Sequence, residues 1–369
     1  MSIRRGLATA LMAVVASASC KSTPPIGTDV AGGGNVAVGS GGAAASGGSS
    51  GVGGTIAGGG AASGSTAAGG GLPDPVPKLY PVPSFESCVH APVAEDCAEG
   101  WCTLPPSCFV MGSPESEWHR GRDSENQTAV TLTHSIEVQQ KELTRAEWTQ
   151  ITGIAPRGPD SCTESACPVS MVSWWDAVHA ANLLSEQKDL DPCYEPVGCT
   201  GTLGQDLTCT GVSDPDKSVY ECEGYRLPTR AEAEYAARAG TWSTFYSGDI
   251  TEYEDSASCL IDPALEKIAW YCFNSGNRAH VGGELEPNAF GLFDMIGNLG
   301  EWSNEWQHGN SSPGGADPRG SVGTAEERLR LSPQFDDKSW ILRAATLLSG
   351  TWNGRTYSTG FRLVRTLSD

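Results

Sequence analysis

The sequence predicts an α+β domain that is rich in loops and stapled by disulfides. Three segments start with a hydroxyl residue that is followed three positions later by a carboxylate, which is the capping box of a helix. Short stretches of alternating polar and apolar residues predict strands, and long stretches rich in glycine, proline and aspartate separate them. Thirteen cysteines indicate an oxidising compartment.

The net charge of -20 excludes one large class of function. A chain this acidic repels nucleic acid and anionic membrane surfaces, so we expect no nucleic-acid partner.

The first twenty residues resemble an export signal. Arg4 and Arg5 precede an apolar run from Leu7 to Ala18, which is too short to span a membrane. Cys20 follows small residues, as in bacterial lipoproteins, and simple secretion is the alternative. We therefore expect residues 1–20 to be a signal peptide of the lipoprotein type. Lipidation of Cys20 would then attach the protein to the outer membrane or cell surface, or place it in the periplasm.

The next segment contains almost no large side chain and cannot form a core. Residues 21–77 are rich in glycine, alanine and serine, which predicts a disordered tether with a mean reach of about 40 Å. Residues 78–108 form a cysteine-rich lead-in, and residues 109–369 form the main domain.

Besides Cys20, the twelve remaining cysteines are an even number, which favours six disulfides. Zinc is the competing interpretation, but no pair has Cys-x-x-Cys spacing. We expect two local bridges within residues 88–108 and a nested arrangement in the next loop. In that loop we expect Cys193 to pair with Cys222 and Cys199 with Cys209. In a later loop we expect Cys259 to pair with Cys272.

The regular elements follow in order. A strand is expected from Phe109 into a turn at Gly112 and Ser113, and a second strand from Ala129 to Val138. The three capping boxes predict helices over 145–152, 174–187 and 230–239. Gly153 and Gly240 stand where helix ends are expected.

The stretch from Pro287 to Trp306 follows neither the strand nor the helix period, and glycines interrupt it, which predicts a buried, looping backbone. Its side-chain oxygens and turned carbonyls are the ligands that calcium prefers. The oxygens come from Asn288, Asp294, Asn298 and Glu301.

This stretch resembles the signature Asn-Ala-Phe-Gly-Leu-Tyr-Asp-Met-x-Gly-Asn-x-x-Glu-Trp of the sulfatase-modifying-factor family, which includes the formylglycine-generating enzymes. Similar matches occur at 168–177, 225–240, 342–345 and 360–365, in the order of the family. The resemblance covers about residues 100–368. It implies an irregular fold related to C-type lectins, with a groove that holds an extended peptide in active members.

The resemblance also implies a structural calcium ion. Carried over by position, Ile296, Gly297 and Leu299 would supply backbone carbonyls and Glu301 a carboxylate. The alternative is a buried, hydrogen-bonded Glu301 without a metal. Gly300 stands where the family usually has tryptophan.

Active family members bind copper through a C-terminal cysteine pair, and this chain departs from that pattern. Its last cysteine is Cys272, and Ser332 and Pro333 replace two glycines of the turn before the pair. Asp337 falls near the first missing cysteine, in an Asp-Asp-Lys run for which we expect a solvated turn. Copper is therefore not expected, unless Cys272 lies free beside this turn. The six histidines lack the His-x-x-x-His spacing of an iron site.

By elimination, the sequence predicts an exported protein that binds a peptide, a glycan or an envelope protein, with no catalytic residues. The alternative is a formylglycine-generating oxidase that acts on a cysteine-containing protein substrate through other ligands.

Overall fold

A computed structural model describes residues 87–121, 123–158, 162–214, 218–251, 259–306, 313–320 and 327–368. The predicted signal peptide, the lipidation site Cys20 and the predicted tether lie outside these ranges. The chain divides into two units, Met1–Asp74 and Pro75–Asp369, and the described residues all belong to the second unit.

Three α-helices form where the capping boxes predict them. They are α1 (Arg145–Thr152), α2 (Trp174–Gln187) and α3 (Arg230–Arg238). In each helix the N-cap hydroxyl and the carboxylate three residues later exchange both hydrogen bonds of the box. Helix α3 ends one residue earlier than predicted, because Ala239 already adopts the left-handed conformation, at φ 44°.

Within the described residues, the strands form four small sheets, and three short 3₁₀ helices accompany them. In the order of pairing, the first sheet contains β1 (Cys97–Ala98), β2 (Trp101–Leu104), β5 (Ile136–Gln139) and β13 (Val364–Thr366). The second contains β11 (Leu348–Thr351), β10 (Glu327–Leu331), β8 (Gly300–Trp306) and β12 (Thr359–Gly360). The other two are β3 (Ser107–Met111), β4 (Thr128–Leu132) and β9 (Gly315–Ala316), and β6 (Pro196–Val197) with β7 (Gly211–Val212). The 3₁₀ helices are η1 (Asp123–Glu125), η2 (Val219–Glu221) and η3 (Ser339–Ile341).

Two sequence predictions about strands are wrong in part. The single strand expected over 129–138 is two strands, because β4 pairs with β3 while β5 pairs with β2 and β13 in another sheet. The loop expected over 287–306 ends at Leu299, and β8 follows it. Most of β8 is buried, so its residues lack the polar-apolar alternation that reveals a strand.

The described cysteines pair as predicted. Six disulfides form, including the nested pair and the later loop. The full set joins Cys88 to Cys108, Cys97 to Cys102, Cys162 to Cys167, Cys193 to Cys222, Cys199 to Cys209, and Cys259 to Cys272.

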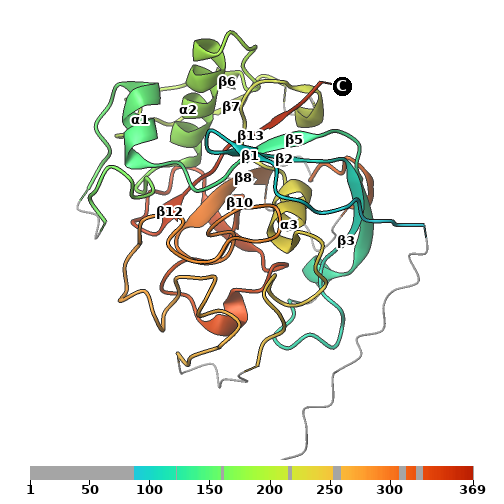
Figure 1. Cartoon of the computed structure of the whole chain (residues 1–369). Helices are drawn as coiled ribbons and strands as arrows, with labels where there is room; N and C mark the ends of the chain where they lie inside the picture. Colours follow the sequence, from blue (N-terminus) through green and yellow to red (C-terminus); the bar gives the residue numbers. More distant parts are fainter. Residues whose placement is uncertain are drawn as a thin grey trace, which may run out of the picture. The chain divides into compact units, whose positions relative to one another are not determined.

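A core rich in tryptophan positions the second sheet. Helices α1 and α2 pack together, and Figure 1 shows them side by side, with β8 and β10 nearby. Trp174 and Trp175 at the start of α2 and Trp302 of β8 are fully buried in one cluster. The indole of Trp174 donates a hydrogen bond to the Ser303 carbonyl at 2.8 Å, which fixes α2 against β8.

Candidate functional site

The bend after β10 is a compact, closed turn where the family resemblance places a cysteine pair. Ser332 adopts a left-handed φ of 60°, and Pro333 follows it. The Gln334 amide donates to the Asp337 carboxylate at 2.9 Å, and the Asp337 amide donates to the Gln334 carbonyl at 3.0 Å. Arg330 fills the adjacent space, because its guanidinium donates to the side chains of Gln334 and Thr359. The cavity beneath the bend has a volume of only about 30 Å³.

The prediction of a solvated turn at residues 336–338 is correct about the turn and wrong about its exposure. All three residues are half-buried, and burial raises the pKa of Asp337. Asp336 has a buried carboxylate oxygen, Oδ1, without a hydrogen-bond partner. These carboxylates complete the turn.

The last cysteine lies against this bend. The Cys272 amide donates to the Asp337 carbonyl at 3.1 Å, and its sulfur is bonded to Cys259. Cys272 therefore contacts the bend through its backbone, and its sulfur is held in a disulfide.

Gly300 fits this bend because it has no side chain. A Cβ atom there would lie 3.3 Å from the Ser332 carbonyl oxygen and 3.6 Å from the Ser358 carbonyl oxygen. Gly300→Trp is therefore expected to lower the free energy of unfolding by about 1 to 3 kcal/mol through overpacking. Urea denaturation checks this, with exposed Trp242→Phe as a control for a change in aromatic content. Unchanged stability of the Gly300 variant would show that the bend can move aside.

The residues predicted to bind calcium occur together, but Glu301 already has a cationic partner. Arg362 donates to both of its carboxylate oxygens at 2.7 to 2.9 Å. The guanidinium occupies one side of the carboxylate and neutralises it, so the donor set does not fit a calcium ion bound through Glu301 without rearrangement. These contacts favour the alternative interpretation, a buried and hydrogen-bonded Glu301, and the calcium site stays a prediction.

The predicted carbonyl donors lie in a loop that another buried carboxylate holds. Glu142 accepts hydrogen bonds from the Asn298 side chain at 2.6 Å and from the Leu299 amide at 2.8 Å. Burial, with the nearby charge of Asp294, raises the pKa of Glu142 well above its ordinary value. The side chains of Ile296 and Leu299 are buried in separate hydrophobic clusters, and the Gly297 carbonyl accepts from the Ser332 hydroxyl at 3.4 Å.

His179 lies close to two cysteines. One nitrogen of His179 and the sulfur atoms of Cys199 and Cys209 lie within 4.8 Å of one another. Both sulfurs belong to one disulfide, so they are not thiolate ligands.

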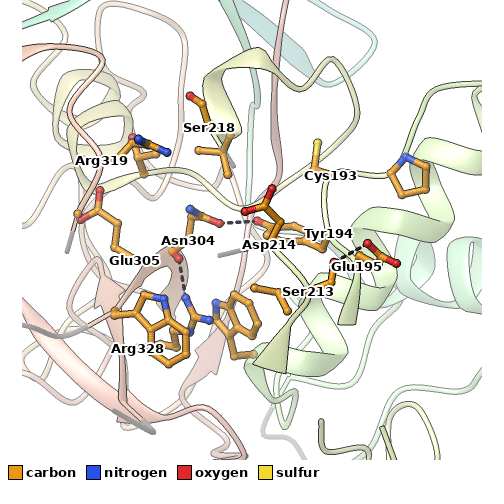
Figure 2. Close-up of a pocket in the computed structure, with 17 residues that line it drawn as sticks. Cys193, Tyr194, Glu195, Ser213, Asp214, Ser218, Asn304, Glu305, Arg319 and Arg328 are labelled. Carbon is orange, nitrogen blue, oxygen red and sulfur yellow. Dashed lines mark hydrogen bonds between the residues drawn. The ribbon is translucent and has the colours of Figure 1, made fainter. Parts of the chain in front are cut away.

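A larger cavity lies further along β8 and β10, between these strands and the loop after α2. Its volume is about 390 Å³. Figure 2 shows Arg319, Glu305 and Arg328 along one side, Cys193 and Glu195 on the other, and Asn304 and Asp214 between them. The size falls in the range of about 300 to 1,000 Å³ that is usual for small-ligand sites.

Arg328 of β10 is held between two indole rings in the wall of this cavity. Its guanidinium carbon lies 3.7 Å from the ring centre of Trp174 and 3.5 Å from that of Trp306. The β-ladder sets this arrangement, because Arg328 is paired with Trp306 across β8 and β10. Burial lowers the pKa of Arg328 to about 9, so it remains a cation at neutral pH.

Tyr194 and Asn304 form a hydrogen-bonded pair in the same cavity. The Tyr194 hydroxyl accepts from the Leu227 amide at 3.0 Å and donates to Asn304 Oδ1 at 2.9 Å. Burial raises the pKa of Tyr194 to about 12, which keeps the hydroxyl protonated. The Asn304 amide group therefore has a defined orientation.

Glu305 is a buried carboxylate of the cavity wall whose pKa is shifted. Its carboxylate accepts from the Arg230 amide at 3.1 Å, and burial raises its pKa to about 7. The folded state therefore binds a proton between the ordinary pKa of 4.5 and about pH 7, where the unfolded state does not.

This proton makes stability depend on pH. The contribution of Glu305 to stability is fully present below pH 4.5 and is lost as the pH rises to about 7. We expect Glu305→Gln to flatten the fall in melting temperature between pH 5 and pH 7 relative to the wild type. Thermal denaturation at half-unit pH steps measures this, and parallel curves would contradict the raised pKa.

Sequence reasoning missed this cavity. Asn304 and Trp306 follow the family signature directly, but Arg328 and Tyr194 come from distant segments whose sequence shows no motif. The position of Arg328 between two indole rings depends on the register of β10 against β8, and the sequence gives no direct signal for this register.

Curated relatives match parts of the chain. A chaperone protein, LppX of Paenibacillus barcinonensis, is 28% identical over 201 residues, which are 47% of this chain and 62% of that protein. The formylglycine-generating enzyme of Mycobacterium tuberculosis is 41% identical over 97 residues, which are 25% of this chain and 31% of the enzyme. The chain thus spans less than two thirds of each of these relatives.

Solved structures share the fold over most of the chain. Treponema denticola variable protein 1 aligns with a TM-score of 0.55 and 21% identity, over 74% of this chain and 99% of that one. PvdO from Pseudomonas aeruginosa aligns with a TM-score of 0.55 and 20% identity, over 76% of this chain and 99% of that one. These likenesses, with the strands, loops and disulfides described above, confirm the α+β fold predicted from the sequence.

A family model matches the part of the chain that contains the motifs quoted above. The model of the sulfatase-modifying factor enzyme 1-like domain matches residues 91–367, which include α1 to α3, the bend after β10 and the cavity. The chain belongs to the sulfatase-modifying factor family.

Proposed function

We propose that this family member is an exported binding or accessory protein that does not perform the thiolate oxidation of formylglycine-generating enzymes. One observation carries the proposal: the twelve cysteines from Cys88 to Cys272 form six disulfides, and no cysteine follows them in the sequence. Copper bound by thiolates needs deprotonated sulfur, which a disulfide does not supply. The 390 Å³ cavity offers a preformed site for binding.

The relative that is named a chaperone supports an accessory role. Its match covers only part of each chain, and we propose a peptide, a glycan or an envelope protein as the partner of the present protein. No described helix has the length and apolar character needed to cross a membrane. We propose attachment through a lipid on Cys20, with residues 1–20 as the signal peptide and residues 21–77 as the tether. Residues 78–108 are the lead-in and 109–369 the domain.

Copper titration tests the loss of the thiolate centre. The purified, oxidised protein should show no charge-transfer absorption from a thiolate and no tight binding of Cu(I) in competition with a chromogenic chelator. Thiol titration of the denatured chain should find at most the one sulfur of Cys20. Stoichiometric Cu(I) binding by the oxidised protein would contradict the proposal.

A second candidate function rests on the contact between Cys272 and the bend. Reduction of the Cys259–Cys272 disulfide by a dithiol would release a thiol whose backbone contacts Asp337. An oxidase that acts on a cysteine-containing protein would then be active only after reduction. Copper-dependent activity that appears with a dithiol and disappears in Cys272→Ser would support this candidate.

A further inference from the structure

The cavity holds a buried positive charge that no carboxylate neutralises. Arg328 is 2% exposed, and within the described part of the chain it forms no ion pair. Its Nη1 donates to the Asn304 carbonyl at 2.8 Å, while its Nε is buried without a partner.

Three other buried arginines each have a carboxylate partner, while buried Arg230, like Arg328, forms no ion pair among the described residues. Arg226, Arg343 and Arg362 each have a carboxylate oxygen at 2.6 to 2.7 Å. Burial of a charge without a partner costs several kcal/mol, so an unpaired cation in a cavity wall points to an anion that a ligand brings. The two indole rings cover the faces of the Arg328 guanidinium, so its edge is the part left for a ligand.

A second donor lies beside this cation. The Tyr194 hydroxyl accepts a hydrogen bond from the Leu227 amide, so its own O–H donates to Asn304, which identifies the bonded atom as Oδ1. The Asn304 amide nitrogen has no hydrogen-bond acceptor among the described residues. Arg328 and Asn304 thus offer N–H groups side by side, an arrangement that suits a carboxylate.

The carboxylates in the remaining walls favour a ligand that also carries hydroxyl groups, and Arg319 adds a second cation to the lining. Asp214 and Glu195 line the cavity, and Glu195 accepts a hydrogen bond from the Ser213 hydroxyl. These carboxylates repel a compact dianion such as phosphate, whose charges lie on one group, and they can accept hydrogen bonds from hydroxyl groups. Asp214 and Asn304 both line the cavity, so hydrogen-bond acceptors and donors border the same space.

We propose that this cavity binds a uronic acid unit of an acidic saccharide, with the carboxylate against Arg328 and Asn304 and the hydroxyl groups toward Asp214. The inference deepens the proposed binding function and depends on it. A volume of about 390 Å³ suits one or two sugar rings better than a long peptide.

Calorimetry with three probes tests the assignment. The probes are digalacturonate, a neutral galactose disaccharide, and an acetylated dipeptide with a free C-terminal carboxylate, at pH 7 and low salt. The wild type should bind digalacturonate at least about tenfold more tightly than either other probe, because a charged hydrogen bond contributes about 1.5 to 3 kcal/mol.

Two variants and one matched control locate the site. Arg328→Met keeps an apolar chain between the indoles but removes the charge, and Asn304→Asp keeps the oxygen that Tyr194 contacts but repels an anion. Each should weaken digalacturonate binding by about tenfold or more. Arg330→Met is the control, since Arg330 lies on the same strand and does not line the cavity, and its effect should stay below about twofold. Circular dichroism confirms that each variant is folded.

Each other outcome overturns the assignment. If the neutral disaccharide binds equally well, the cavity does not recognise a carboxylate. If the dipeptide binds more tightly, the ligand is the C-terminus of a peptide rather than a saccharide. If digalacturonate does not bind, or if both folded cavity variants bind it as the wild type does, this cavity is not a site for uronic acids. Copper-dependent oxidation would overturn the proposed function while leaving these results in place, so the two failures are distinguishable.

Discussion

Glu301→Gln is expected to lower the free energy of unfolding by about 3 to 5 kcal/mol, equally with and without calcium, because it leaves Arg362 buried beside a neutral amide. Arg362 and Glu301 have side chains that are 1% and 5% exposed. Arg362 also donates to the carbonyls of Phe293 and Asp294, so its charge joins the segment between β12 and β13 to the signature loop. Guanidinium chloride denaturation of the wild type and the variant, once in EDTA and once in millimolar calcium, measures the change in the free energy of unfolding without and with calcium.

A second ion pair provides the control. Arg365 and Glu137 form a bridge at 2.5 Å with side chains that are each 25% exposed. Glu137→Gln should therefore cost no more than about 1 kcal/mol. A Glu301 variant that loses stability only in calcium would contradict the interpretation of Arg362 as the partner and would restore the predicted metal site.

Glu232→Gln is expected to cost about 3 to 5 kcal/mol for a related reason. Glu232 completes the capping box of α3, and both of its oxygens accept from Arg226 at 2.7 Å, where both side chains are almost fully buried. Glutamine can still cap the helix at this position but cannot neutralise Arg226. Chemical denaturation of the full chain measures the loss.

The matched control is the same substitution in α1. Glu147 occupies the same position of its capping box, accepts from the Thr144 amide at 2.7 Å, and is half-buried with no arginine partner among the described ion pairs. Glu147→Gln should change stability by less than about 1 kcal/mol. Equal effects at both helices would show that capping, rather than the buried ion pair, sets the cost.

These two helices show how far the sequence could predict the fold. Hydroxyl-to-carboxylate spacing is a local signal, so it placed all three helix starts correctly. The even number of cysteines after Cys20 predicted six disulfides, but spacing alone does not fix which cysteines pair, and the structure confirms the nested arrangement. The same local pattern could not show that Glu232 faces a buried arginine while Glu147 does not, because that contact depends on tertiary packing.

The site was predictable only where it followed the family motif. The loss of the C-terminal cysteines could be read directly, whereas the closure of the bend depends on Arg330, Gln334 and Asp337 meeting in space. The cavity around Arg328 depends on the register of β10 against β8 and on Trp174 arriving from α2. No spacing rule brings these three segments together.

Conversion of a cysteine-containing peptide by the oxidised protein, with copper and oxygen supplied, is the most direct measurement of the central claim. The peptide would carry a Cys-Thr-Pro-Ser-Arg sequence, with mass spectrometry for product and an electrode for oxygen uptake. We expect neither formylglycine nor oxygen consumption above the copper-only background, because the described sulfurs are held in disulfides. Repeated turnover above that background would contradict the account of a family member that binds without oxidising.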